Sequence, residues 1–353
     1  MAASPDGNTS NRKVEHIRIC LTEDVQAHGI GAGLDEWRFV HQALPEIDLA
    51  QLDLSQQLFG KTITAPLLIS SMTGGAEWGA RINRTLAQAT QKWGLAMGVG
   101  SQRAAVENPD LRYSYAIREI APNVPLLANL GAVQLNYGYG VEQCLVAVQM
   151  LEADALILHL NALQEAVQPS GNVNFKGLLT RIAEVCEKLA CHNIPVVVKE
   201  VGNGISAEVA QRLIAAGVAG LDVGGSGGTS WSQVESFRVK REVEQRAASA
   251  FANWGIPTAQ SILWARQAAN DAPTQVTIIG SGGIRNGVDI AKTIGLGADV
   301  AGMALPFLKA AEQGLEAVND LIEQTLRELR IAMFCIGAAS IQALQDTPHL
   351  IRV

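Results

Sequence analysis

The chain has few of the features that mark membrane, secreted or nucleic-acid-binding proteins. It contains no run of about 18 apolar residues, so no membrane span is expected, and its polar first ten residues lack the apolar core of a secretory signal. The five cysteines are scattered without a C-x-x-C pair, which disfavours a disulfide framework or a zinc site. The 27 basic and 34 acidic residues give a net charge of −7, which disfavours general nucleic-acid binding. We therefore expect a cytoplasmic protein that binds neither membranes nor nucleic acids.

Apolar residues are abundant and make up 48% of the 353 residues. Eight short runs rich in Val, Ile, Leu and Ala lack the alternation of half-exposed strands, which is typical of strands buried on both faces. These runs are 66–71, 95–99, 125–130, 155–160, 195–199, 220–223, 276–280 and 299–303.

Amphipathic segments separate these strands and predict helices. They are 78–93, 109–120, 141–151, 175–190, 206–216, 258–269 and 287–294, with a C-terminal helix over 315–344. Eight alternating strands and helices predict an α/β fold of the (β/α)8 TIM-barrel type. A doubly wound open sheet is the alternative, because periodicity does not show whether the sheet closes.

Two regions lie outside the barrel count. Residues 1–60 are expected to form an N-terminal arm that packs on the barrel, which would then occupy residues 61–353. Residues 224–256, after the sixth strand, form a long loop rich in Gly, Ser and charge. Loops of that length are usually functional lids or are disordered.

Polar residues gather where the predicted strands end, and barrel enzymes carry their chemistry at these ends. The fourth strand runs directly into His159, Asn161, Gln164 and Glu165, a polar cluster for which a core strand has no structural use. The other ends carry 71–75, 100–103, Asn129, 199–200, 224–229, 281–285 and 301–304. Together they predict one functional face.

The turn Gly282-Gly283-Ile284-Arg285 follows the seventh strand and opens a helix. Backbone N–H groups at such a turn bind anions, and barrel phosphate sites commonly lie after strands seven and eight. The alternative is an ordinary turn that needs glycine for its backbone angles. Lys199 leaves a buried strand, which favours an anionic partner such as a ring cofactor, although a lysine can also extend to solvent.

Further charged residues suit a diphosphate and a metal ion. Glu165 with Gln164 could hold Mg²⁺, which takes one or two carboxylates and completes its shell with phosphate oxygens and water. The alternative for Glu165 is an acid favoured at a helix start. Arg12, Lys13 and Arg103 are candidate diphosphate clamps, although a basic pair in an arm is commonly a solvated surface feature.

Several of these segments, taken in order along the chain, resemble the type 2 isopentenyl-diphosphate Δ-isomerases. The matching segments are Arg12-Lys13-x-x-His16-Ile17, 39–46 (FVHQALPE), 71–75 (SMTGG), 100–103 (GSQR), 159–161 (HLN) with Gln164-Glu165, 199–204 (KEVGNG), 227–231 (GGTSW) and 282–285 (GGIR). One departure is Gly224, at a place where some members of the family carry Ser.

The resemblance implies an isomerase of isoprenoid biosynthesis that depends on FMN and Mg²⁺. Such an enzyme interconverts isopentenyl and dimethylallyl diphosphate by a 1,3-allylic proton shift, with reduced FMN as acid and base and NADPH or NADH as reductant. It also implies a homotetramer or a homo-octamer. We hypothesise that Lys199 stabilises the anionic reduced flavin.

The resemblance assigns roles residue by residue. Cofactor binding falls to Ser71, Met72, Thr73, Ser101, Asn129, Lys199, Thr229, Gly282, Gly283, Ile284, Arg285, Ala304 and Leu305. Substrate binding falls to Arg12, Lys13, His16, Ser101, Gln102, Arg103, His159, Asn161 and Gln164. Glu165 would hold the metal, and the catalytic residues would be His159, Gln164, Lys199 and Glu235.

Two other functions stay open. An FMN-dependent barrel oxidoreductase of the 2-hydroxy-acid oxidase type would share the Gly-Gly-Ile-Arg turn. Those enzymes usually need a histidine base near strand seven, and here the only histidine after His192 is His349. A non-enzymatic flavin- or phosphate-binding module is the third possibility, and the polar cluster at 159–165 argues against it.

Overall fold

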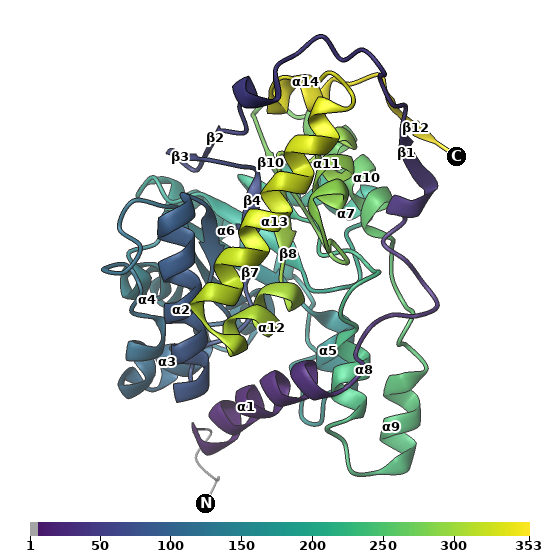
Figure 1. Cartoon of the computed structure of the whole chain (residues 1–353). Coiled ribbons are helices and arrows are strands. Elements are labelled where there is room, and N and C mark those ends of the chain that lie inside the picture. The colour runs from purple at the N-terminus through teal and green to yellow at the C-terminus, as the bar shows by residue number, and fades with distance from the viewer. Residues whose placement is uncertain (1–5) are drawn as a thin grey trace, which may run out of the picture.

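The eight apolar runs form the eight parallel strands of a closed barrel (Figure 1). The structure, a computed structural model, describes residues 6–353, with side chains from residue 11 onward; the start of the polar N-terminal stretch lies outside this range. The strands are β4 (Leu67–Ile69), β5 (Ala96–Gly98), β6 (Leu126–Gly131), β7 (Ala155–Leu160), β8 (Val196–Glu200), β9 (Gly220–Asp222), β10 (Thr277–Ser281) and β11 (Val300–Met303). Because β11 pairs with β4, the sheet closes, so the (β/α)8 prediction is confirmed and the open sheet is wrong.

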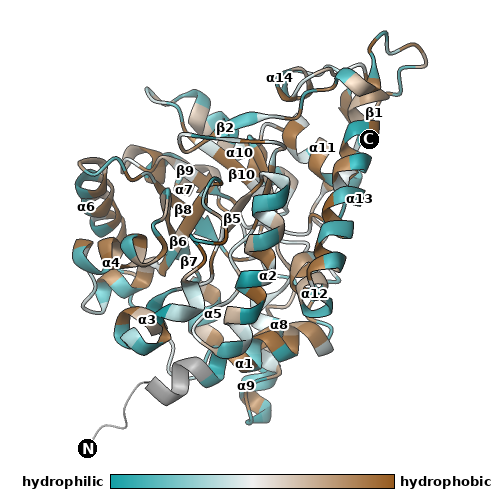
Figure 2. Ribbon diagram, turned by 60° about the vertical axis from the view of Figure 1, so that its left-hand side comes forward, coloured by the Kyte–Doolittle hydropathy of each residue, from teal (hydrophilic) through white to brown (hydrophobic). Residues whose placement is uncertain are grey.

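Helices surround the barrel and bury one face each against it. They are α2 (Glu77–Trp93), α4 (Val141–Leu151), α6 (Leu178–Ala190), α7 (Ala207–Ala215), α10 (Thr258–Asn270), α11 (Gly287–Gly295) and α12 (Leu305–Gln313). In α6 the buried residues Ile182, Val185 and Leu189 recur at helical spacing. Figure 2 shows the result, with apolar strands inside and helices that are polar on part of their surface. None of the described helices is both long enough and apolar enough to span a bilayer.

A two-stranded antiparallel hairpin closes the N-terminal end of the barrel, which we call the base. It consists of β2 (Gln56–Leu58) and β3 (Lys61–Ile63). Leu58 and Ile63 are buried in one cluster with interior residues of the barrel strands. The predicted boundary between arm and barrel, after residue 60, falls in the turn of this hairpin.

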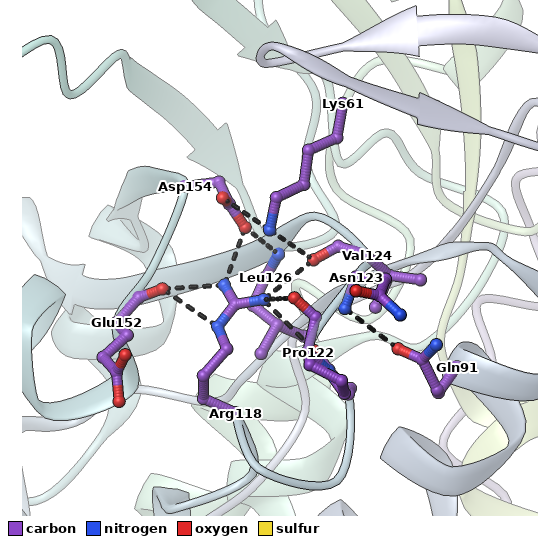
Figure 3. Close-up of polar contacts among 10 residues, drawn as sticks. Lys61, Gln91, Arg118, Pro122, Asn123, Val124, Leu126, Glu152 and Asp154 are labelled. Carbon is purple, nitrogen blue, oxygen red and sulfur yellow. Dashed lines mark hydrogen bonds and ion pairs between the residues drawn. The ribbon is translucent and has the colours of Figure 1, made fainter.

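Polar groups at the base are paired with one another (Figure 3). Arg118 donates to the carbonyl oxygens of Val124 and Glu152 and to the Asp154 carboxylate, the last at 2.7 Å. Asp154 also accepts from the backbone N–H of Leu126 at 2.8 Å and forms an ion pair with Lys61 at 2.9 Å. This network ties the hairpin to the starts of β6 and β7.

The same arrangement recurs four strands further round the barrel. Arg266 donates to the Gly297 carbonyl oxygen at 2.6 Å and to the Asp299 carboxylate at 2.7 Å. Asp299 accepts from the backbone N–H of Ile278, the second residue of β10, at 2.7 Å. Each aspartate precedes a strand and joins it to the strand before, so both halves of the base are closed in the same way.

Two of the predicted helices differ in the structure. Residues 109–120 are not an α-helix: α3 (Arg103–Glu107) is followed by a 3-10 helix, η3 (Pro109–Tyr115), whose last residue is fully buried. The predicted C-terminal helix is divided into α13 (Leu315–Phe334) and α14 (Ile341–Gln345). The break follows from Gly337 in the left-handed region, with the Ala338 N–H bonded to the Met333 carbonyl, a common glycine-dependent helix stop.

The arm and the long connection both contain helices at the C-terminal end of the barrel, which we call the rim. The arm begins with α1 (Asp6–Thr22), which packs near α3, α8 and α12 (Figure 1). The connection over 224–256 contains α8 (Trp231–Ser236) and α9 (Glu242–Ser249). The remaining elements are α5 (Ala162–Val167), the short helices η1 (Leu34–Glu36), η2 (Leu49–Gln51) and η4 (Ala132–Asn136), and the antiparallel pair β1 (Trp37–Phe39) with β12 (Leu350–Arg352).

Candidate active site

One cavity of about 550 Å³ opens at the rim, a volume within the usual range for small-molecule sites. Its walls come from the ends of the barrel strands, and α1 lies over it. Nearly all the residues predicted for the site line it: Arg12, Lys13, His16, Ser71, Met72, Thr73, Ser101, Arg103, Asn129, His159, Asn161, Gln164, Glu165, Lys199, Thr229, Gly282, Gly283, Ile284, Arg285, Ala304 and Leu305. Gln102 and Glu235 do not.

The side chain of Gln102 points away from the cavity, so it is not placed to contact a substrate as predicted. It supports the neighbouring strand instead. Its side chain is fully buried, donates to the Ala147 carbonyl at 2.8 Å, and accepts from the Asn129 N–H at 2.9 Å. Gln102 therefore fixes the end of β6, where Asn129 faces the cavity. The sequence placed Gln102 at a strand end but could not give the direction of its side chain.

Glu235 is fully buried just behind the cavity wall. Its Oε1 lies 2.9 Å from His16 Nε2 and accepts from Gln164 Nε2 at 3.1 Å, while Oε2 pairs with Arg238. Burial raises the pKa of Glu235, but the His16 hydrogen bond and the Arg238 charge outweigh burial and the net pKa is lowered. Glu235 is thus a carboxylate that orients His16 and Gln164.

His159, at the end of β7, is held in one tautomer by its neighbour on β6. Its Nδ1 lies 2.8 Å from Asn129 Oδ1, so Nδ1 carries the proton and Nε2 is left as an acceptor. Burial, followed by the positive charges of Lys199 and Lys13, lowers the pKa of His159 to about 4. The imidazole is therefore neutral at neutral pH.

Lys199, at the end of β8, meets a carboxylate that the sequence analysis did not identify. Its Nζ lies 3.1 Å from Asp222 Oδ2, and Asp222 is fully buried at the end of β9. A second missed residue is Tyr115, whose hydroxyl donates to the Ser101 carbonyl at 2.6 Å. Asp222 lies inside the predicted strand 220–223 and not after its end, so it gave no signal of a site residue, and Tyr115 looks like an ordinary core aromatic residue.

Positive charge enters the cavity from α1. Lys13 Nζ donates to the Ser101 carbonyl and to the Tyr115 hydroxyl, both at 2.5 Å. Burial, with a smaller effect from the adjacent Arg12, lowers the pKa of Lys13 to about 7. Two neighbouring cations held in a cavity are unfavourable until an anion joins them, so this end of the cavity is suited to a phosphate-bearing ligand.

Glu165, in the first turn of α5, is the cavity's candidate metal ligand. Its carboxylate accepts from Asn161 Nδ2 at 3.0 Å and from the Asn172 N–H at 2.5 Å. Within residues 11–353 no cluster of three or more His, Cys, Asp or Glu side chains could hold a metal by itself. A single carboxylate fits Mg²⁺ that completes its shell with substrate phosphate oxygens and water.

The glycine-rich turn after β10 packs backbone against backbone. Gly283 has a φ of 72°, and a Cβ there would lie 2.5 Å from the Gly227 carbonyl oxygen. Arg285 donates to Gln26 Oε1 at 2.9 Å, a contact with the arm that was not predicted. Gly224 has a φ of 45°, and a Cβ would overlap the Glu200 carbonyl oxygen, so this backbone has no room for the Ser found in some family members.

Several buried polar atoms in the cavity wall lack a hydrogen-bond partner among the described residues. They are the hydroxyls of Ser71 and Thr73 and the Oδ1 of Asn161. A buried polar atom without a partner is costly and calls for an explanation such as a ligand. These atoms and the glycine turn fit a polar ring system with a phosphate tail.

The fold and the rim cavity place the chain among flavin-dependent barrel enzymes. A family model described as FMN-dependent dehydrogenase matches residues 162–352. Solved structures support the fold: a mandelate oxidase variant aligns with a TM-score of 0.64 at 16% identity over 99% of this chain and 100% of that one. A lactate oxidase from Pediococcus acidilactici aligns with a TM-score of 0.61 at 17% identity, over 96% and 86% of the two chains.

Curated relatives define the family more closely. A Nostoc protein is 51% identical over 350 residues, covering 99% of this chain and 98% of its own, and is named isopentenyl-diphosphate delta-isomerase. Proteins of the same name from Synechocystis and Oceanobacillus iheyensis are 50% and 48% identical, each over 97% of this chain and 96% of their own. The chain belongs to the isopentenyl-diphosphate delta-isomerase family, in its FMN-dependent type 2 form, which confirms the resemblance seen in the sequence.

Proposed function

We propose that the chain interconverts isopentenyl diphosphate and dimethylallyl diphosphate by a 1,3-allylic proton shift that uses reduced FMN and Mg²⁺. One observation carries this proposal. A single cavity gathers residues suited to a flavin, a metal and a diphosphate, in a chain that is 51% identical over 350 residues to a protein named as this isomerase.

The flavin would lie along the ends of β4, β6 and β8. The unpartnered Ser71 and Thr73 hydroxyls, with Asn129 and Lys199, would contact the ring. The phosphate tail would lie at the turn over 282–285, where backbone N–H groups precede α11. The Ser71 and Thr73 hydroxyls have no hydrogen-bond partner among the described residues, which supports the place given to the ring.

When bound in its reduced form, FMN would supply the acid and base chemistry for moving the proton, with NADPH or NADH as the source of its electrons. The chain's own residues set the charge around that step. Lys199 offers a positive charge to an anionic ring. His159, with a pKa of about 4, is neutral and adds no positive charge against the cation that develops when an alkene is protonated.

The diphosphate would lie between α1 and the end of β7. Arg12, Lys13 and Arg103 line this part of the cavity, and Glu165 would hold Mg²⁺ against the phosphate oxygens. Because α1 covers the cavity, it would also keep water from a developing carbocation.

Gln164 is fixed at both ends of its amide. Its Nε2 donates to Glu235 and its Oε1 accepts from Asn161 Nδ2 at 3.1 Å. A side chain held in this way can orient a substrate without titrating. Glu235 would act through Gln164 and His16, since it does not itself line the cavity.

The proposal is tested with purified protein under anaerobic conditions. Isopentenyl diphosphate, Mg²⁺ and FMN reduced by NADPH or dithionite are combined, and product is followed by NMR. We expect dimethylallyl diphosphate, and we expect its loss when FMN is left oxidised or when EDTA is added. Isomerisation without flavin, or its absence with fully reduced flavin and Mg²⁺, would contradict the proposal.

The 2-hydroxy-acid oxidase alternative has no specific support at the site. The relevant solved structures are 16–18% identical and show the shared fold. His349 does not line the cavity, and its Nδ1 lies 3.2 Å from Gln42 Nε2. Reduction of the bound flavin by lactate or mandelate in the same experiment would favour the oxidase.

We also propose that the chain assembles as a homotetramer or a homo-octamer. Apolar side chains remain exposed near α9, including Val243 at 72% and Trp254 at 63%. Exposed apolar groups of this kind are suited to subunit contacts. Light scattering on the purified protein would give the mass directly, and a monomer would contradict the proposal.

A further inference from the structure

Asp222 lies at the rim on β9, between β8 and β10, and contacts one side chain from each of these two strands. It ends β9 and is paired in register with Lys199 of β8. Ser281, at the end of β10, lies on its other side and donates its hydroxyl to Asp222 Oδ1. Asp222 is fully buried and Lys199 is 8% exposed, so this group is almost entirely shielded from solvent.

The contact between Asp222 and Lys199 is an ion pair without an aligned hydrogen bond. Lys199 Nζ lies 3.1 Å from Asp222 Oδ2, yet Oδ2 has no hydrogen-bond donor among the described residues. Lys199 donates instead to the Glu200 carbonyl at 3.0 Å, with Ser281 Oγ further away at 3.4 Å. Because an ammonium has three N–H donors, this arrangement leaves one for the cavity that Lys199 lines.

Glu200, the other carboxylate close to Lys199, does not take the place of Asp222. Its Oε2 accepts backbone N–H groups from Val201, Gly202 and Asn203 at 2.6, 2.8 and 2.5 Å. Among the described residues, the Asp222 side chain forms an ion pair with Lys199, whereas the Glu200 side chain does not. A fully buried carboxylate is costly unless a cation meets it, so Asp222 and Lys199 depend on each other.

We propose that Asp222 is a positioning residue that holds the Lys199 ammonium at the cavity wall and reduces the positive charge that it presents there. This inference rests on the proposed place of the flavin ring beside Lys199. An anionic reduced ring is stabilised by positive charge more than an oxidised neutral ring is. Asp222 therefore sets how much more tightly the site binds reduced FMN than oxidised FMN.

The test is the reduction potential of FMN bound to the full chain, measured anaerobically for three variants. Asp222→Asn removes the negative charge and keeps the shape, so we expect the preference for reduced FMN to rise about tenfold. For a two-electron couple this is a shift of about 30 mV to more positive potential. Lys199→Met should shift the potential in the opposite direction. Asp154→Asn, the same substitution at the base, is the matched control and should leave the potential unchanged.

The possible outcomes separate this inference from the proposed function. If Asp222→Asn lowers the melting temperature but leaves the potential unchanged while Lys199→Met shifts it, Asp222 is purely structural and the inference is overturned. If Lys199→Met also leaves the potential unchanged, the ring does not lie beside Lys199 and both ideas fail. Should Asp222→Asn not fold, Ser281→Ala removes the hydrogen bond to Asp222 and strengthens its negative field. That variant should shift the potential to more negative values, and no shift would overturn the inference.

Discussion

The two ends of the barrel use polar residues in opposite ways. At the base, Arg118 and Asp154 satisfy each other and the backbone around them (Figure 3). Arg266 and Asp299 repeat the arrangement on the other side of the barrel. At the rim, the hydroxyls of Ser71 and Thr73 have no partner among the described residues. The base is therefore stabilised by hydrogen bonds and ion pairs within the protein. The rim leaves polar groups free to bind ligands, and this lowers the stability of the protein.

The difference extends to charge. Each arginine of the base network meets an aspartate at 2.7 Å. Lys13, at the rim and next to Arg12, contacts the Ser101 carbonyl and the hydroxyl and ring of Tyr115, and its pKa falls to about 7. We therefore expect substitutions in the paired charges of the base to change stability. We expect substitutions of the rim cations Arg12 and Lys13 to change ligand binding.

The largest expected effect comes from the candidate metal ligand at the rim. Glu165→Gln keeps the shape of the side chain but removes the charge that would hold Mg²⁺, so we expect isomerase activity to fall at least ~10²-fold. The free energy of unfolding should change little. Steady-state assays over a range of Mg²⁺ concentrations and urea unfolding check both. Glu208→Gln is the matched control, because its side chain is 80% exposed; equal activity of the two variants would rule out the metal role.

The next largest effect is expected at the base, where a substitution should lower stability and leave activity unchanged. Arg118→Met leaves Asp154 and several carbonyl oxygens without their donor, and both side chains of the pair are mostly buried, at 14% and 18% exposed. We expect the free energy of unfolding to fall by about 2 kcal/mol, less than for a fully buried pair. Denaturant unfolding measures this change. The kcat of the folded protein should be unaltered, and a fall in kcat without a loss of stability would break the distinction between the two ends.

A pH dependence is expected from Lys13. With a pKa of about 7, this side chain is cationic below neutral pH and loses its charge as the pH rises. Affinity for a diphosphate should therefore fall about tenfold between roughly pH 6 and pH 9, as expected for loss of one charged hydrogen bond. Calorimetric titration with pyrophosphate and Mg²⁺ measures it.

Ionisation of the ligand would change the affinity in the opposite direction, because pyrophosphate gains negative charge as the pH rises. A decline can thus be assigned to the protein. Lys13→Met should bind weakly and without this pH step. An identical step in Lys13→Met would exclude Lys13 as its source.

The smallest expected effect concerns the unpartnered hydroxyls. Ser71→Ala and Thr73→Val remove buried groups that have no partner among the described residues, so each should stabilise the ligand-free protein by about 1 kcal/mol or less. Each should also weaken FMN binding severalfold. Thermal unfolding with and without FMN measures both effects, and a loss of stability in the ligand-free protein would show that these hydroxyls are satisfied internally.

The sequence predicted the barrel well because its strands are buried on both faces. Such strands appear as uninterrupted apolar runs, and all eight runs became barrel strands. The rim residues could also be predicted, because the geometry of a closed parallel barrel places every strand's C-terminal end at the same face. His159 and Lys199, 40 residues apart in the chain, are paired in register for this reason.

Side-chain direction and the particular contacts between the arm and the rim could not be predicted. Gln102 and Ser101 are adjacent, yet one is turned into the core and the other lines the cavity. The position of α1 over the rim depends on long-range contacts, such as that of Lys13 with Tyr115, which leave no periodic pattern in the sequence. Asp222 was missed because it lies within the predicted strand 220–223, whereas the polar residues that predicted the site follow the strands.

The most direct test of the central claim follows two quantities in one anaerobic sample: the product formed from isopentenyl diphosphate and the absorbance of the reduced flavin. The account predicts many molecules of dimethylallyl diphosphate per flavin while the flavin stays reduced, because a double bond moves without net electron transfer. One product per flavin, formed as the flavin becomes oxidised, would contradict it.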